Sequence, residues 1–192
     1  MKKLLIVAVA TVFTNFSFAQ MMNHSMNKMS GEKTVTVGGA PMYPSKNIVE
    51  NAVNSKDHTT LVAAVKAAGL VETLQSAGPF TVFAPVNTAF DKLPAGTVEN
   101  LLKTENKMAL TGVLTYHVIA GKLSAKALMA KIKAGNGKAM LKTVAGGNLW
   151  FMMKGKKIFI KDEKGGMAFV TIKDVNQSNG VIHVIDSVLL PN

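Results

Sequence analysis

The chain contains no cysteine among its 192 residues. Disulfide bonds hold together many small domains that cannot build a sufficient core, and a lipoprotein carries its lipid on a cysteine. Both devices are therefore excluded. Stability must come from a hydrophobic core, and a domain of about 145 residues can bury roughly 70% of its unfolded surface, which is enough for one.

Arginine is also absent, so lysine supplies all 22 basic residues, against 11 acidic ones, for a net charge of +11 at pH 7. The planar guanidinium of arginine is the usual group for reading bases and phosphates in pairs of hydrogen bonds. Sequence-specific binding of nucleic acid is therefore not expected. A lysine surface favours loose, salt-dependent attraction to polyanions such as acidic polysaccharide, or serves only as a soluble, self-repelling surface.

Catalytic motifs are missing as well. The sequence has no Gly-x-Ser-x-Gly elbow and no His-Glu-x-x-His metal helix. Residues 135–138 resemble a phosphate loop, but Ile132 and Ala139 stand where its first glycine and its Ser or Thr are required. Asp162 and Glu163 fall in an expected turn, where carboxylates are usually solvated. We therefore expect no enzyme.

Residues 1–19 have the features of a secretion signal. Lys2 and Lys3 give a positive start, a short apolar run extends to Phe13, and Ser17 and Ala19 are the small residues that a signal peptidase reads. The run is shorter than the ~20 residues of a spanning helix, and no second run of that length follows. We expect cleavage near Ala19, no transmembrane segment in the mature chain, and a secreted or periplasmic protein.

Residues 20–46 are polar and rich in methionine, glycine and proline, which predicts a flexible tail. Within it, soft donors fall close together at Met21, Met22, His24, Met26 and Met29. Thioether and imidazole groups suit Cu(I). The tail is therefore a candidate copper site, although methionine also occurs near signal junctions by chance.

Residues 47–192 should form the folded domain. Apolar residues recur at spacings of three and four from Leu61 to Leu74, which predicts a helix that ends at Gly69 and a further turn. Asn87, Thr97 and Ser124 are placed to cap further helices. A helix is also expected from Glu105 to Thr115, and a buried strand from Phe80 to Ala84.

After Gly135 the pattern changes to short β-rich runs separated by glycines or by Asn179-Gly180. The expected strands are Lys138 to Val144, Asn148 to Lys154, Lys156 to Lys161, Met167 to Val175 and Val181 to Leu190. Helices early and strands late argue for an α+β domain.

Three ordered blocks resemble the signatures of the fasciclin domain family: FTVFAPVNTAF from Phe80, LTYHV from Leu114 and NGVIHVIDSVLLP from Asn179. Val86 stands where the family usually has Thr, and Thr104 where bacterial members often have Pro. The resemblance implies a fasciclin-like wedge of β-sheet with small helices packed along it.

Tyr116 and His117 form the second block. In some animal fasciclin domains this block has been linked to integrin recognition, so the resemblance offers both residues as a binding site. The alternative is that His117 is a buried, hydrogen-bonded residue and Tyr116 packs in the core. His183, between Ile182 and Val184, is expected to be a core or edge residue.

These observations favour an exported, non-enzymatic adhesion module that binds a surface or matrix. Its partner would be a cell-surface or matrix protein or an acidic polysaccharide. The alternative is a periplasmic or secreted copper-binding protein that acts through the tail.

Overall fold

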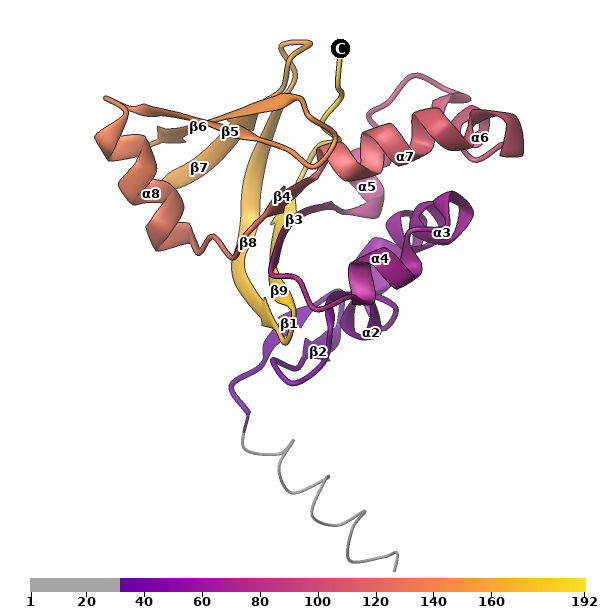
Figure 1. The fold of residues 1–192 in the computed structure, drawn as a ribbon, viewed down its shortest axis with the longest axis horizontal. Helices are drawn as coiled ribbons and strands as arrows, with labels where there is room; N and C mark the ends of the chain where they lie inside the picture. The colour runs from indigo at the N-terminus through magenta and orange to yellow at the C-terminus, as the bar shows by residue number, and fades with distance from the viewer. Residues whose placement is uncertain (1–31) are drawn as a thin grey trace, which may run out of the picture. The chain divides into compact units, whose positions relative to one another are not determined.

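The computed structural model describes residues 32–192, which fold around a seven-stranded sheet in the order β4-β3-β9-β8-β7-β6-β5 (Figure 1). Only β3 and β9 pair in parallel; the other neighbours are antiparallel. The strands are β3 (Phe80–Pro85), β4 (Val118–Ala120), β5 (Lys138–Lys142), β6 (Asn148–Lys154), β7 (Lys157–Lys161), β8 (Met167–Gln177) and β9 (Gly180–Ile185). All five strands expected after Gly135 are present, within a few residues at each end except at the C-terminal end of the last.

The long strand β8 bends the sheet. Its pairing with β9 shifts register between Val170 and Ile172 and again between Ile172 and Val175. Asp174 lies in the second shift with a φ of 58°, and its carboxylate accepts the backbone N–H of Ala125 at the start of a helix, 2.7 Å away. Such bulges increase local twist and re-aim a strand. The part of the sheet made of β5, β6 and β7 and the part made of β3 and β9 can therefore enclose a common core.

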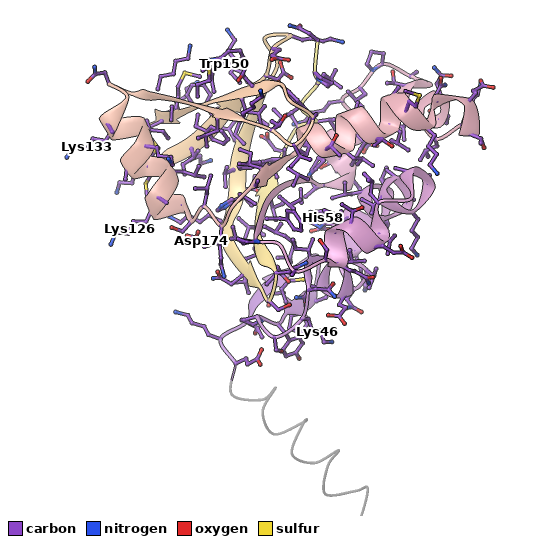
Figure 2. The ribbon with its side chains drawn as sticks, in the orientation of Figure 1. Lys46, His58, Lys126, Lys133, Trp150 and Asp174 are labelled. Carbon is purple, nitrogen blue, oxygen red and sulfur yellow. The ribbon has the colours of Figure 1, made fainter. Side chains whose placement is uncertain are left out.

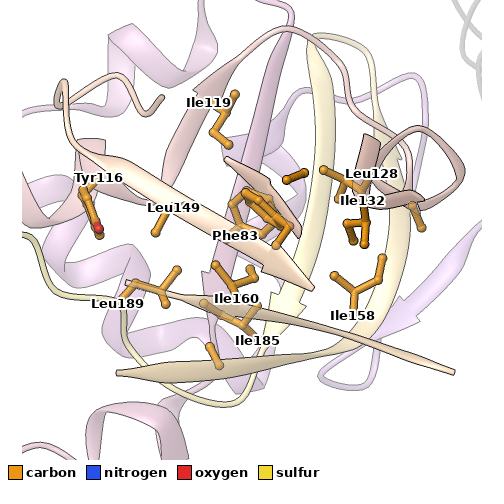
Figure 3. Packing of buried hydrophobic residues seen from close by; sticks show 14 residues of the cluster. Phe83, Tyr116, Ile119, Leu128, Ile132, Leu149, Ile158, Ile160, Ile185 and Leu189 are labelled. Atoms are coloured by element: carbon orange, nitrogen blue, oxygen red, sulfur yellow. The ribbon is translucent and has the colours of Figure 1, made fainter. Parts of the chain in front are cut away.

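That core is the largest cluster of buried apolar side chains (Figure 3). Phe83 of β3 meets Phe151 of β6 with ring centroids 5.2 Å apart. Leu128 and Ile132 close the cluster from helix α8 (Ala125–Ala134), whose N-terminus is capped by the Ser124 side chain, as expected.

Short helices gather beside the other half of the sheet (Figure 1). They are α2 (Ile48–Ala52), η1 (Lys56–His58), α3 (Thr59–Ala68), α4 (Val71–Gln75), α5 (Asn87–Phe90), α6 (Thr97–Leu101), η2 (Thr104–Asn106) and α7 (Lys107–Tyr116). Gly69 ends α3 in the left-handed conformation, as expected. Two smaller apolar clusters join these helices to the sheet and to one another.

Two expected caps are wrong. Neither Asn87 nor Thr97 caps its own helix with its side chain. The Asn87 side chain instead accepts from Thr60 N at the start of α3, 3.1 Å away, and donates to Lys56 O. Asn87 therefore caps a helix distant in sequence, and ties α3 to the end of β3.

The prediction of a flexible tail up to residue 46 is also wrong for residues 32–46, the part that the structure describes. Strands β1 (Val35–Val37) and β2 (Ala40–Met42) form a hairpin, and Val37 and Met42 are buried in the second apolar cluster. Gly38 and Gly39 make the two-residue turn with φ of 57° and 78°, as such turns require. The compact unit therefore begins at Lys33, not near Asn47.

Candidate functional site

Tyr116, at the end of α7, is fully buried. Its hydroxyl donates to the carbonyl of Asn148, 2.7 Å away, and accepts the N–H of Glu163 at 3.1 Å. Burial raises the pKa of the phenol to about 12, because the charged form would lose its water. The side chain fastens α7 to the two ends of the β6–β7 hairpin.

His117 is buried beside it, and both ring nitrogens have backbone partners. Nδ1 lies 2.8 Å from the carbonyl of Val113, and Nε2 lies 3.0 Å from the N–H of Leu189. These contacts fix one neutral tautomer, in which Nδ1 donates and Nε2 accepts. Burial lowers the pKa of His117 to about 4, against smaller opposing effects of the Val113 hydrogen bond and of Asp162.

The predicted binding site at Tyr116 and His117 is thus made of two interior side chains. A partner at this block would meet the backbone and the neighbouring side chains, not the phenol or the imidazole. His183 is also in the core, as expected: it stacks on Phe83 and bonds to Leu123 O through Nε2 and to Asp174 N through Nδ1.

The predicted copper ligands, Met21, Met22, His24, Met26 and Met29, lie outside the described residues, as does the signal. Within residues 32–192 no group of three or more His, Asp or Glu side chains is placed to hold a metal ion. No helix in that part of the chain is long and apolar enough to cross a membrane.

The surface most suited to binding is the outer face of strands β5 to β8, which points away from the core. The register of these strands places the side chains of the outer face in two adjacent rows. One row is Met140, Trp150, Lys161 and Met167; the next is Lys138, Met152, Phe159 and Phe169. Figure 2 shows Trp150 projecting outward from β6.

Three aromatic rings and three methionines therefore lie together on this outer face, which we call the outer sheet face. Met140 and Met167 are 61% and 59% exposed, whereas the three rings are half-buried. Phe159 and Phe169 are in contact, with centroids 5.9 Å apart. A contiguous apolar patch of this kind, rimmed by polar groups, is typical of an interaction surface.

The charged residues on this face of β5 to β8 are all lysines. Five exposed lysines belong to the outer sheet face by the same alternation: Lys138, Lys142, Lys154, Lys157 and Lys161. Lys138 lies over the ring of Trp150, with 5.3 Å from Nζ to the centroid, and Lys154 lies over Phe169 at 5.9 Å. No acidic residue occupies this face on β5 to β8.

The nearest carboxylates in the sequence are turned inward. Asp162 is buried and accepts from Gly166 N at 2.6 Å and Leu190 N at 2.9 Å, which contradicts the solvated position expected for it. Glu163 accepts from Asn148 N at 2.9 Å. Both carboxylates bind backbone N–H groups of the C-terminal segment and the hairpin, so these two charges are not turned toward the lysines of the outer sheet face.

A hollow of about 420 Å³ adjoins the outer sheet face at Phe169 and Lys157. Lys156 and Lys173 also line it. Asp186 is its one acidic residue, and one of its carboxylate oxygens accepts the N–H of Phe169 at 2.8 Å. The hollow extends the basic surface beyond the flat part of the sheet.

Sequence reasoning located these strands but not their outer face as a site. The signal was present: the runs LWFMM in β6 and IFI in β7 are apolar on both sides of the strand. Such runs usually mark strands buried on both faces. Here α8 and the core cover only one face, so the second apolar face is left for contact.

Comparisons with known proteins agree with the family resemblance found in the sequence. A family model for the fasciclin domain matches residues 56–191. Protein sll1483 of Synechocystis is 44% identical over 185 residues, which cover 96% of each chain. Human periostin is 32% identical over 136 residues, covering 71% of this chain and 15% of periostin.

Among solved structures, the chain resembles a FAS1 domain pair from the insect cell adhesion molecule fasciclin I. The TM-score is 0.67 at 18% identity, covering 83% of this chain and 58% of that one. At this identity the likeness shows the fold alone.

Proposed function

The chain belongs to the fasciclin domain family, and on that premise we propose that it is an exported, non-enzymatic adhesion module that binds acidic polysaccharide through the outer sheet face. The observation that supports this most is the combination of half-buried aromatic rings with five exposed lysines and no acidic side chain on this face of β5 to β8, Asp186 being the one acidic residue of the adjoining hollow.

The chemistry of the surface matches that ligand class. The rings of Trp150, Phe159 and Phe169 offer flat apolar area for the C–H faces of sugar rings. Lysine ammonium groups are mobile point charges that suit carboxylates or sulfates at irregular spacing. Four adjacent strands present about 14 Å of width, which suits a polymer chain more than a single sugar.

Membership of the fasciclin domain family supports the general function proposed, which is adhesion. The insect protein with the same fold is a cell adhesion molecule, and the export signal expected at residues 1–19 would deliver this chain to a surface or matrix. An acidic cell-surface or matrix protein is the competing partner, and the experiment below distinguishes it.

The test compares two double variants of equal charge change. Lys142→Glu with Lys161→Glu alters the outer sheet face, whereas Lys126→Glu with Lys133→Glu alters exposed positions on α8 (Figure 2). On an alginate column, the first should elute at much lower salt than the unmodified protein, and the second should elute near it. Neutral dextran should retain none of them.

Equal losses in both variants would mean that only net charge matters, and would contradict a defined face. Retention of the unmodified protein that survives ~1 M salt, where the screening length is ~3 Å, would contradict lysine contacts. Failure of any acidic polysaccharide to bind, with capture of an acidic surface protein instead, would overturn the choice of partner.

A second function rests on a separate observation, the five methionine and histidine residues between Met21 and Met29. We propose for this group a Cu(I) site that would act independently of the sheet.

A further inference from the structure

The apolar side chains beside β3 and β9 do not pack into one continuous core. One cluster includes Val82 and Ile182 of the sheet, and another includes Val65 of α3 and Leu114 of α7. A cavity of about 90 Å³ lies where these clusters meet, lined by side chains of α2, α3, α4, β3 and β9. We call it the helix-side cavity.

Native interiors contain few voids larger than a water molecule, so a cavity of this size is a feature that requires an explanation. Twenty of its 26 lining residues are Val, Leu, Ile, Ala, Met or Phe, and the other six are Ser55, His58, Lys66, Thr73, Thr115 and His117. A buried water needs two to four polar partners, which this wall does not offer, so water is a poor occupant. The chemistry of the wall favours an apolar molecule.

One polar group on the wall lacks a partner. His58 is 4% exposed, and its Nδ1 is 2.9 Å from the hydroxyl of Ser55. Its Nε2 is buried without a hydrogen-bond partner, which among the described residues is true of no other buried side-chain nitrogen or oxygen. Figure 2 shows His58 between the sheet and the helices, and it contributes to the cavity lining.

The protonation state and tautomer of the His58 ring determine which ligand group could form a hydrogen bond with Nε2. Burial lowers the pKa of His58, so the ring is neutral near pH 7. Two smaller effects oppose the shift: Asp57, and the backbone of Ala84, which lies near the ring without meeting the geometry of a hydrogen bond. The Ser55 hydroxyl can donate to Nδ1 or accept from it, which leaves Nε2 as a donor or as an acceptor. An alcohol can meet either tautomer, because a hydroxyl both donates and accepts.

We propose that the helix-side cavity is a binding site for a small apolar molecule that carries one hydroxyl group, with the hydroxyl on His58 Nε2 and the hydrocarbon against the wall. A carboxylate is a poorer ligand, since a charge would be buried in an apolar cavity without a paired ion. The cavity volume of about 90 Å³ limits the buried part to a small hydrocarbon group.

The experiment uses methyl NMR of the full mature chain with two probes of the same shape, cyclopentanol and methylcyclopentane. Both should shift the methyl signals of Val62 and Val65, which line the cavity. Cyclopentanol should bind about tenfold more tightly, as one added hydrogen bond implies. It alone should move the imidazole nitrogen signals of His58.

Two variants locate the site. His58→Leu should bind methylcyclopentane more tightly than cyclopentanol, because the buried hydroxyl would then have no hydrogen-bond partner. Ala52→Leu, which places a larger side chain on the cavity wall, should bind neither. If His58→Leu does not fold, the imidazole signals of the unmodified chain decide the same point. Absence of methyl shifts, equal affinity of the unmodified chain for both probes, or unchanged binding by Ala52→Leu would each overturn the proposal.

Discussion

His117 makes the protein sensitive to acid. Its pKa is about 4 in the folded chain, against 6.5 when exposed, so the unfolded chain takes up a proton first as the pH falls. The contribution to stability is complete above pH 6.5 and is lost progressively as the pH falls toward 4. A difference of about 2.5 units bounds the loss at about 3 kcal/mol, of which about 2 kcal/mol is lost by pH 5.

The structure gives the reason for this loss. Protonation would put a hydrogen on Nε2, which now accepts the N–H of Leu189 3.0 Å away, so two donors would face each other. His58 and His183 are buried too, and burial lowers both of their pKa values, so they act in the same direction. Acid should therefore weaken the attachment of the C-terminal segment to α7.

His117→Gln removes the titrating group and leaves an oxygen able to accept from Leu189. At pH 7 the variant should lose about 1–3 kcal/mol of unfolding free energy, because the bond to Val113 is lost. Between pH 7 and pH 5 its stability should fall about 2 kcal/mol less than that of the unmodified protein. Urea unfolding at both pH values measures this, with a constant m-value as the check on two-state behaviour.

Equal acid sensitivity of the two proteins would refute the reasoning, since His117 would then not be the neutral, doubly bonded residue described above. Greater stability of the variant at pH 7 would refute the account of its hydrogen bonds.

Four further outcomes are expected. Tyr116→Phe should lower the free energy of unfolding by about 1–3 kcal/mol in urea, because two buried backbone groups lose their shared hydroxyl. Gly180→Ala should prevent or strongly weaken folding, seen as loss of cooperative unfolding, because the new Cβ would lie 2.2 Å from the carbonyl oxygen of Phe80. In competition with a Cu(I) chelator, the mature chain should bind copper more tightly than a chain shortened to begin at Glu32, and equal affinity would rule out the tail. Mass spectrometry of protein from the native host should show a chain that begins at Gln20, and an intact first residue would contradict export by cleavage.

The strands after Gly135 could be predicted because glycines or Asn179-Gly180 separate short apolar runs, so each boundary has a local signal. The parallel pairing of β3 with β9 has no such signal. It joins residues about 100 positions apart, so no local feature of the sequence predicted it.

Other features escaped prediction because they depend on distant partners. Gly38 and Gly39 looked like breakers in a tail, yet they form a hairpin turn. Its neighbour Val37 is buried in the same apolar cluster as residues of β8 and β9. Asn87 caps a helix that precedes it by 27 residues. The outer sheet face could be found only when the register put Trp150 beside Lys161 and Met140.

The most direct test of the central claim uses Trp150, which is the chain's only tryptophan and lies on the outer sheet face. Titration of the mature protein with alginate oligomers should change the intensity or wavelength of Trp150 emission with saturation, and added salt should reverse the change. Binding that is measured by calorimetry under the same conditions while Trp150 emission stays constant would show that the ligand contacts another surface, and would contradict the account.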